Sequence, residues 1–191
     1  MSTLEKSGYH HGDLRAALVS AAMEMLEAGE PFSLRAIARK AGVSQTAPYR
    51  HFKDRDALES ALAAEGFRDL LASLGDGRNP PASLQDLAEF AVAYVAFALR
   101  RPALFRVMFG KPCDDADDER VRAAGALHEL LTVALGRVFP DADAPALASA
   151  GWGLAHGLAC LYLDGKLHAT SSEEVAEHVR SAFLAIASVG S

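Results

Sequence analysis

The apolar residues of this 191-residue chain recur every three or four positions along most of its length, and no segment shows the alternation typical of a strand. The pattern therefore predicts an all-α protein. We expect the first helix to begin at Asp13, a good N-cap residue, and to stop at Gly29. Its predicted buried stripe consists of Leu14, Leu18, Ala21, Ala22, Met25 and Leu26.

The segment SLRAIARKAGVSQTAPYRHF predicts two short helices joined by a tight turn. Ser33 and Ser44 stand where N-caps are needed, and Gly42 can reverse the chain between them. The second of these helices is expected from Gln45 to about Phe52. Ala38 and Gly42 are small enough to let two helices cross at close range. Together with the first helix, the pattern predicts a three-helix head that contains a helix-turn-helix.

Further helices are predicted after the head. A fourth helix, capped by Asp54, should run to about Leu74 as a connecting helix. Residues 75–83 (GDGRNPPAS) cannot continue a helix and mark a linker. The predicted domains are residues 1–60 and residues 61–191. Apolar periodicity in the second domain predicts a helical bundle with helices over 84–101, 103–109, 119–138, 145–163 and 172–188.

Charge is distributed unevenly along the chain. Residues 1–60 carry eight basic and eight acidic residues, whereas residues 61–191 carry eleven and seventeen and hold the whole net charge of −6. Between Arg35 and Arg55 there are six basic residues against a single acid, Asp54. A nucleic-acid surface is therefore expected on one face of the head only, because the second domain would repel DNA.

The third helix carries side chains suited to reading base pairs. Its exposed residues should be Gln45, Thr46, Tyr49 and Arg50, with Ser44 and His51 at its ends. Gln and Arg can make bidentate contacts with adenine and guanine, respectively. The residues better placed for phosphates are Ser33, Tyr49, Lys53 and Arg55. The alternative interpretation is a plain helical hairpin inside a core.

The stretch IARKAGVSQTAPYRHFKDRDAL resembles the DNA-binding signature of the TetR-type family of bacterial transcriptional regulators, and the resemblance extends from about His11 to Leu62. It implies a homodimer on a near-palindromic operator in double-stranded DNA. The DNA contacts that it implies are Ser33, Arg35, Gln45, Thr46, Ala47, Tyr49, His51 and Arg55.

Pro48 departs from the family pattern, which usually has an aliphatic residue there. As the fourth residue of the predicted recognition helix, Pro48 has no N–H to donate to the Ser44 carbonyl. We expect a strained but intact first helical turn, which leaves the pose of Gln45 and Thr46 open.

A second motif, GWGLAHGLACL (151–161), places Trp152 and His156 on one helical face and Gly153 and Gly157 on the neighbouring face. Glycines inside a helix are tolerable where another backbone passes close by. The motif resembles the Trp-His-Gly (WHG) subclass of the family's C-terminal regulatory domain. The resemblance implies that the last two helices pair with their copies in a four-helix dimer interface. Three interpretations of His156 stay open: a hydrogen-bonded packing residue, a pocket residue or a metal ligand.

A set of mostly aromatic side chains at helical spacing is predicted in the second domain. Such residues usually form a core, and the resemblance implies that some of them line a cavity for a small-molecule effector. Tyr94 or His156 would then supply a polar anchor. The candidate ligand-binding residues are Phe90, Tyr94, Phe97, Phe105, Met108, Phe109, Trp152 and His156.

No motif supports catalysis, a cofactor or a metal site. The chain has no Ser/His/Asp order, phosphate-binding glycine loop or Cys-x-x-Cys, and Asp114 to Asp118 lack the glycine and glutamate of a calcium loop. We count no apolar run of the roughly 18 residues that a membrane helix needs, and the N-terminus lacks the apolar core of a signal peptide. We therefore expect a cytoplasmic, nucleoid-associated protein without a membrane partner.

These observations predict a repressor that a small-molecule effector releases from its operator. Two alternatives remain. The first is an effector-independent DNA-binding regulator or an activator. The second is a ligand-binding protein or enzyme with an incidental helix-turn-helix, which would need a convergent polar constellation in the second domain.

Overall fold

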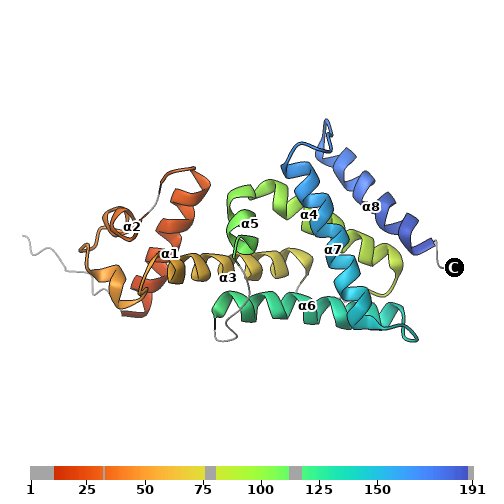
Figure 1. The fold of residues 1–191 in the computed structure, drawn as a ribbon, viewed down its shortest axis with the longest axis horizontal. Coiled ribbons are helices and arrows are strands. Elements are labelled where there is room, and N and C mark those ends of the chain that lie inside the picture. The colour runs from red at the N-terminus through yellow and green to blue at the C-terminus, as the bar shows by residue number, and fades with distance from the viewer. Residues whose placement is uncertain (1–10, 32, 76–80, 112–117, 189–191) are drawn as a thin grey trace, which may run out of the picture. The chain divides into compact units, whose positions relative to one another are not determined.

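The computed structural model describes residues 11–31, 33–75, 81–111 and 118–188. All regular elements in these ranges are helical, as the apolar periodicity predicts, and the all-α class is confirmed. The chain divides into two compact units, Met1–Leu62 and Ala63–Ser191. The helix α3 (Arg55–Leu74) contributes residues to both units (Figure 1).

The first unit contains α1 (His11–Glu27) and α2 (Leu34–Lys40), which pack against each other. Helix α1 begins two residues before the predicted Asp13. Its end is as predicted, because Gly29 takes a left-handed φ of 68° and the Glu30 N–H donates to the Met25 carbonyl at 2.9 Å. The fully buried apolar residues of this unit are Leu18, Ala22, Ile37, Ala38, Leu58 and Leu62.

The turn after α2 is also the predicted one. The Ser33 hydroxyl accepts the Ala36 N–H at 3.2 Å and so caps α2. Gly42 has a φ of 70°, and the Val43 N–H donates to the Ala38 carbonyl at 2.9 Å. Together these features form a glycine-terminated helix end. It turns the chain toward residues 45–51, the predicted recognition segment.

The predicted third α-helix over 45–52 is wrong in its extent and type. The structure has a short 3₁₀ helix, η1 (Ala47–Arg50), preceded by a turn at Gln45 and Thr46. Pro48 explains the difference, because it lacks the N–H for the first α-helical bond and disfavours helical geometry at Ala47 before it. The Ser44 hydroxyl does not cap this element and instead lies 3.3 Å from the Thr46 hydroxyl.

Helix α3 begins where it was expected. The Asp54 carboxylate accepts the Ala57 N–H at 2.8 Å, and the helix runs to Leu74. The end of the predicted linker at 81–83 precedes the next helix, whereas residues 76–80 lie outside the described part of the chain.

The second unit is a helical bundle whose boundaries follow the predicted ones closely. The helices are α4 (Leu84–Arg100), α5 (Pro102–Phe109), α6 (Glu119–Val138), α7 (Ala144–Leu163) and α8 (Ser172–Ser188). Helix α4 packs against α7 and α8, and α6 packs against α7 (Figure 1). Ser83 caps α4 by accepting the Asp86 N–H at 3.1 Å.

Helix α7 corrects the expectation that no apolar run is long enough to cross a membrane. It has 20 residues without a Lys, Arg, Asp or Glu, and the mean hydropathy over an 18-residue window is 1.3. Only 22% of that window is buried inside the chain. A helix this apolar and this exposed in a single chain has a face that is available to another apolar surface.

Candidate nucleic-acid interface and apolar cavity

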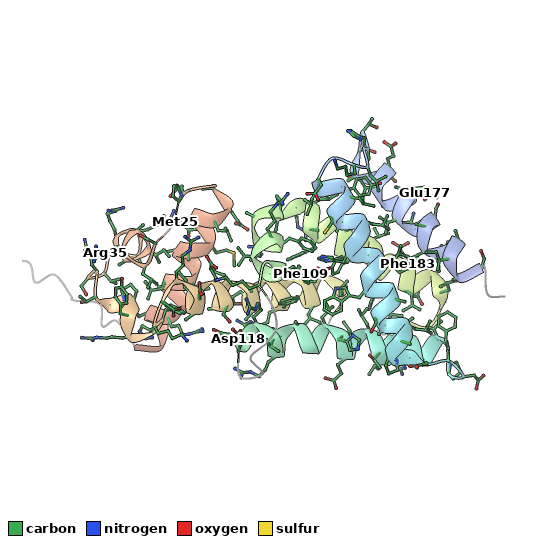
Figure 2. The ribbon with its side chains drawn as sticks, in the orientation of Figure 1. Met25, Arg35, Phe109, Asp118, Glu177 and Phe183 are labelled. Atoms are coloured by element: carbon green, nitrogen blue, oxygen red, sulfur yellow. The ribbon has the colours of Figure 1, made fainter. Side chains whose placement is uncertain are left out.

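The first unit presents the predicted DNA-contact residues at the start of α2, in the turn and η1, and at the start of α3. All but two of them are exposed; Ala47 and His51 are half-buried. Arg35, for example, is an exposed side chain of α2, whereas Met25 of α1 is buried (Figure 2). The exposed candidates are Ser33, Arg35, Ser44, Gln45, Thr46, Tyr49, Arg50, Lys53 and Arg55.

The recognition segment is anchored by one buried residue and exposes its neighbours. Pro48 is buried, and its carbonyl accepts the N–H groups of His51 and Phe52, both at 2.9 Å. Tyr49, by contrast, is 51% exposed, which is unusual for a large aromatic side chain. Pro48 thus fixes η1 against the core while Tyr49 and Arg50 remain available to a partner.

Ion pairs reduce the positive charge of this region. Lys40 pairs with Glu24 of α1 at 3.4 Å, and Arg55 pairs with Glu59 one turn along α3 at 2.7 Å. Exposed pairs of this kind contribute little to stability. Their acids lie outside the stretch from residue 35 to residue 55, so sequence proximity alone did not identify them.

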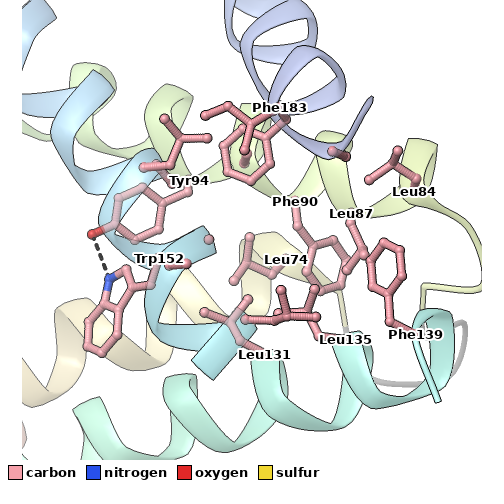
Figure 3. A pocket seen from close by; sticks show the side chains of 18 of the residues that line it. Leu74, Leu84, Leu87, Phe90, Tyr94, Leu131, Leu135, Phe139, Trp152 and Phe183 are labelled. Carbon is pink, nitrogen blue, oxygen red and sulfur yellow. Dashed lines mark hydrogen bonds between the residues drawn. The ribbon is translucent and has the colours of Figure 1, made fainter. Parts of the chain in front are cut away.

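The second unit contains a cavity of about 490 Å³, within the usual size range of small-molecule sites. Helices α3, α4, α6, α7 and α8 all contribute to its wall (Figure 3). Its lining residues are Leu74, Leu84, Leu87, Phe90, Ala91, Tyr94, Leu127, Leu131, Leu135, Phe139, Ala142, Leu147, Ala150, Gly151, Trp152, Leu154, Ala155, Phe183, Ile186 and Ala187.

The polar groups of Tyr94, Trp152 and His156 bond to one another at the wall of the cavity. The Trp152 indole N–H donates to the Tyr94 hydroxyl at 3.2 Å, and this hydroxyl lies 2.9 Å from His156 Nδ1. His156 Nε2 in turn lies 3.5 Å from Cys160 Sγ. If the His156 hydrogen is on Nε2, the Tyr94 hydroxyl can donate to Nδ1. Each polar group of this hydrogen-bond network then has a partner.

Burial keeps this network uncharged. Desolvation lowers the pKa of His156 below its ordinary value, which favours the neutral imidazole. Burial also raises the pKa of the Tyr94 hydroxyl, so the phenol stays protonated. The His156 ring stacks with Phe105, with 5.3 Å between ring centroids, and meets Phe109 edge to face at 4.5 Å. His156 is hydrogen-bonded and packed against aromatic rings, which favours the first of its three interpretations. Among the described residues there is no group of His, Cys, Asp or Glu that could hold a metal ion.

Of the predicted ligand-binding residues, the structure places three in the cavity wall and five outside it. Phe90, Tyr94 and Trp152 line the cavity. The other five are not lining residues; Phe105 and Phe109, with His156, form an aromatic cluster on the far side of Tyr94 and Trp152. The five are Phe97, Phe105, Met108, Phe109 and His156.

The leucines of α6 are among the lining residues that were not predicted from the sequence. Leu127, Leu131 and Leu135 recur at intervals of four, and Phe139 continues the series just after the helix ends. This spacing places them on one face and could have been noticed. A stripe of leucines predicts a core as readily as a cavity, however, so the signal was ambiguous.

The aromatic cluster also reaches α3. Phe109 of α5 meets Phe67 of α3 edge to face, and Phe109 lies 6.2 Å from Trp152, measured between ring centroids (Figure 2 labels Phe109). Close by, a Cβ at Gly66 would lie 2.6 Å from Met108 Sδ, so the Met108 side chain of α5 packs directly over the α3 backbone and would have to move to admit a side chain there. Arg101, which follows α4, forms an ion pair with Asp69 of α3.

Comparison with known proteins identifies the family. A model described as "Bacterial regulatory proteins, tetR family" matches residues 18–62, and one described as "Tetracyclin repressor-like, C-terminal domain" matches residues 87–183. The second match alone covers half of the chain. The protein belongs to the TetR family. The family consists of DNA-binding transcriptional regulators, which are not enzymes.

Curated relatives of this TetR-family chain are described as HTH-type transcriptional regulators. HTH-type transcriptional regulator Rv1816 of Mycobacterium tuberculosis is 30% identical over 120 residues, which cover 61% of this chain and 49% of the relative. The match thus spans about half the length of that regulator. An uncharacterized HTH-type transcriptional regulator of Haemophilus influenzae is 51% identical over 54 residues, 27% of this chain and 26% of its own.

Solved structures show the same fold over nearly the full length. A protein of unknown function from Rhodococcus sp. RHA1 has a TM-score of 0.77 and 33% identity, covering 93% of this chain and 97% of its own. A bacterial regulatory protein in the tetR family from Rhodococcus RHA1 has a TM-score of 0.65 and 22% identity, with 89% and 94% covered. The second likeness concerns the fold alone.

Proposed function

We propose that this TetR-family protein is a homodimeric repressor that leaves a near-palindromic operator when a small molecule binds in its second domain. The observation that carries the proposal is the cavity of about 490 Å³ in the unit that follows the helix-turn-helix. A partly open pocket of this size with an almost wholly apolar lining is typical of small-molecule sites.

In this proposal, residues 1–60 form the DNA-binding domain. Gln45, Thr46 and Arg50 face base edges, and the remaining contacts go mostly to phosphates. The exposure of Tyr49 and Arg50 on η1 supports this assignment. The proposed contacts are Ser33, Arg35, Ser44, Gln45, Thr46, Ala47, Tyr49, Arg50, His51, Lys53 and Arg55.

Residues 61–191 form the regulatory and dimerisation domain, of the Trp-His-Gly subclass. Support for dimerisation through α7 and α8 comes from the large exposed fraction of the apolar α7. A Cβ at Gly153 or Gly157 would have no described atom of this chain within 4 Å beyond its own helix and chain neighbours. These glycines therefore serve no close approach within the chain, and a second copy is the partner we propose for that face.

Effector binding is coupled to DNA release through α3. The cavity wall at Tyr94 and Trp152 contacts the aromatic cluster of α5, and Phe109 carries that contact to Phe67. A ligand that prefers one arrangement of this cluster shifts α3, and with it the separation of the two heads in the dimer. In the cell the repressor would act in the cytoplasm, associated with the nucleoid.

Selection from a randomised duplex library tests the DNA-binding part of the proposal. The full chain should enrich a near-palindromic site, and Arg50→Ala should weaken its binding by about 5- to 150-fold, equivalent to about 1–3 kcal/mol for one lost base contact. Tyr49→Ala should also weaken binding, and both variants should remain dimers in sedimentation. Arg137→Ala, an exposed arginine of α6, is the matched control.

Two outcomes would contradict the proposal. If Arg50→Ala binds the selected site as tightly as Arg137→Ala does, the recognition face is placed wrongly. If a promoter carrying the selected site is transcribed faster in vitro when the protein is added, the protein is an activator and the repressor role fails.

A further inference from the structure

We propose that the cavity takes an uncharged, lipophilic molecule with no more than one polar group, and that it rejects carboxylates and ammonium ions of the same size. The inference rests on the proposed function, in which an effector enters this cavity, and it adds the chemical class of that effector. The argument comes from the side chains that line the wall, and it is independent of how binding reaches the DNA.

Among the residues that the structure describes, no lining side chain carries a charge at neutral pH. Tyr94 and Trp152 are the only ones of them with a nitrogen or oxygen atom; the rest are Leu, Ile, Phe, Ala and Gly. An ion that left water for such a wall would lose its hydration and find no opposite charge among these residues. A neutral lipophilic molecule would instead gain from burial of its apolar surface.

The two polar side chains of the wall, Tyr94 and Trp152, are already hydrogen-bonded to each other. The Trp152 N–H donates to the Tyr94 hydroxyl, and this hydroxyl can donate its own hydrogen to His156 Nδ1. The phenolic oxygen then retains one lone pair. When the His156 hydrogen is on Nε2, a ligand hydroxyl or amide N–H can donate to that lone pair, whereas a carboxylate, which only accepts, finds no donor there.

The cavity also has two different ends. Figure 3 shows the hydrogen-bonded pair Tyr94 and Trp152 at one end, and Leu84 and Phe139 at the other. The sides between them are formed largely by leucines of α4 and α6. This arrangement fits an elongated molecule with an apolar body whose single polar group lies toward Tyr94.

Binding of matched ten-carbon probes tests the inference. The probes are decan-1-ol, decanoate and decylammonium, below the concentrations at which they form micelles. Trp152 is the single tryptophan of the chain and lines the cavity, so its fluorescence reports occupancy directly. We expect decan-1-ol to bind at pH 7 at least 100-fold more tightly than either ion. Octan-1-ol should bind about tenfold more weakly than decan-1-ol, because two CH₂ groups fewer are buried.

The pH dependence separates exclusion of the ion from weak binding in general. An aliphatic carboxyl group has a pKa near 4.3, so about one decanoic acid molecule in 500 is protonated at pH 7. If only that form enters, the apparent affinity for decanoate falls about tenfold for each pH unit between pH 6 and 8. The affinity for decan-1-ol should show no such slope.

A lining substitution should change the selectivity. In Leu131→Lys, an ammonium group replaces an apolar wall residue of α6. We expect decan-1-ol to bind at least tenfold more weakly and decanoate at least tenfold more tightly than in the unaltered chain. Val133→Lys adds the same charge to the same helix at an exposed position outside the lining, and it should leave both affinities unchanged.

Two results would overturn the inference. The first is an affinity for decanoate within threefold of that for decan-1-ol at pH 7, with no dependence on pH. The second is the absence of any change in Trp152 fluorescence with decan-1-ol up to its solubility limit. The second result would indicate that the dimer partner or the protein itself fills the cavity. If decan-1-ol binds as expected but leaves operator affinity unchanged, the inference stands and the proposed effector release is contradicted.

Discussion

The ring of Phe109 meets the ring of Phe67 edge to face, with 5.3 Å between the ring centroids. Phe67 is buried in α3, whereas Phe109 belongs to α5 and also contacts Trp152 in the wall of the cavity. One aromatic side chain thus lies between the cavity wall and the helix that continues from the first unit. Such a residue can couple two sites only if its arrangement differs between the free and the bound state.

Phe109→Leu should therefore uncouple effector binding from DNA release. Leucine fills much of the volume, so we expect the free energy of unfolding to fall by only about 1–2 kcal/mol. Operator affinity without ligand should stay within about twofold. The ligand-induced loss of operator affinity should decrease by about tenfold, a typical size for allosteric coupling. Gel-shift titrations with and without decan-1-ol measure this directly.

Phe97→Leu is the control for Phe109→Leu. Phe97 is a buried phenylalanine of α4. It does not line the cavity, and it takes no part in the ring contact between Phe109 and Phe67. Its substitution should cost similar stability and leave the coupling intact. Equal coupling in both variants would show that the path through Phe109 is wrong.

Gly153, an exposed glycine of α7, leads to a second prediction, which concerns dimerisation. Gly153→Leu places a side chain where this chain has open space, so the isolated subunit should gain up to about 1 kcal/mol of helix stability. The same side chain should push apart a second copy and raise the dimer dissociation constant at least tenfold. Sedimentation velocity over a concentration series measures that constant.

Gly125→Leu provides the comparison for the dimer experiment. Gly125 is an exposed glycine of α6, and it too has open space beyond its Cβ position. Its substitution should stabilise the helix without changing dimerisation. A Gly153→Leu protein that dimerises as tightly as Gly125→Leu would rule out α7 as the interface.

Pro48 leads to a third prediction, on operator preference. Pro48→Ala restores an N–H that can donate to the Ser44 carbonyl, so the 3₁₀ segment can become an α-helix that begins near Gln45. Gln45 and Thr46 would then approach the groove in a different pose. We expect affinity for the selected operator to fall about tenfold and the preferred bases at the Gln45 and Thr46 positions to change.

Pro145→Ala tests whether the loss of any proline has the same effect. Pro145 lies in the first turn of α7, where a missing N–H costs little. Operator preference in this variant should match the unaltered protein. If repeated selection returns the same site for Pro48→Ala, the pose of the recognition segment does not depend on the proline.

Helix boundaries were predictable from the sequence because they depend on neighbouring residues. The Asp54 cap and the glycine turn at Gly42 lie where the residue types indicate, and α6 spans residues 119–138 as expected. The third helix was not predicted correctly, although Pro48 was recognised as its weak point. The proline removes one bond and also restricts Ala47, and a segment of only eight residues has too few other bonds to compensate.

The cavity was less predictable than the helices. A packed core and an apolar cavity use the same residue types, so spacing alone could not place Phe90 in the wall and Phe97 outside it. The bond between the Tyr94 hydroxyl and His156 joins residues 62 positions apart, a distance over which the periodicity of a single helix gives no information. Only the packing of α4 against α7 decides which polar groups meet.

The partially buried His156 gives the last prediction, on pH dependence. Burial lowers the pKa of His156 in the folded protein below the value of about 6.5 expected in the unfolded chain. As the pH falls below about 6.5, the unfolded chain binds this proton first, so the free energy of unfolding decreases. A protonated Nδ1 also cannot accept from the Tyr94 hydroxyl, so the direction of this hydrogen bond has to reverse, with Nδ1 as the donor.

His156→Asn should reduce this acid sensitivity. Asparagine places an acceptor near the Nδ1 position but does not titrate, and loss of the ring packing against Phe105 and Phe109 should cost about 1–3 kcal/mol at pH 7.5. Urea unfolding at pH 7.5 and pH 5 should then show a smaller decrease for the variant than for the unaltered protein. His178→Asn removes an exposed histidine that is hydrogen-bonded to the Tyr162 hydroxyl, and it serves as the comparison variant. Equal decreases in all three proteins would mean that other groups set the acid sensitivity.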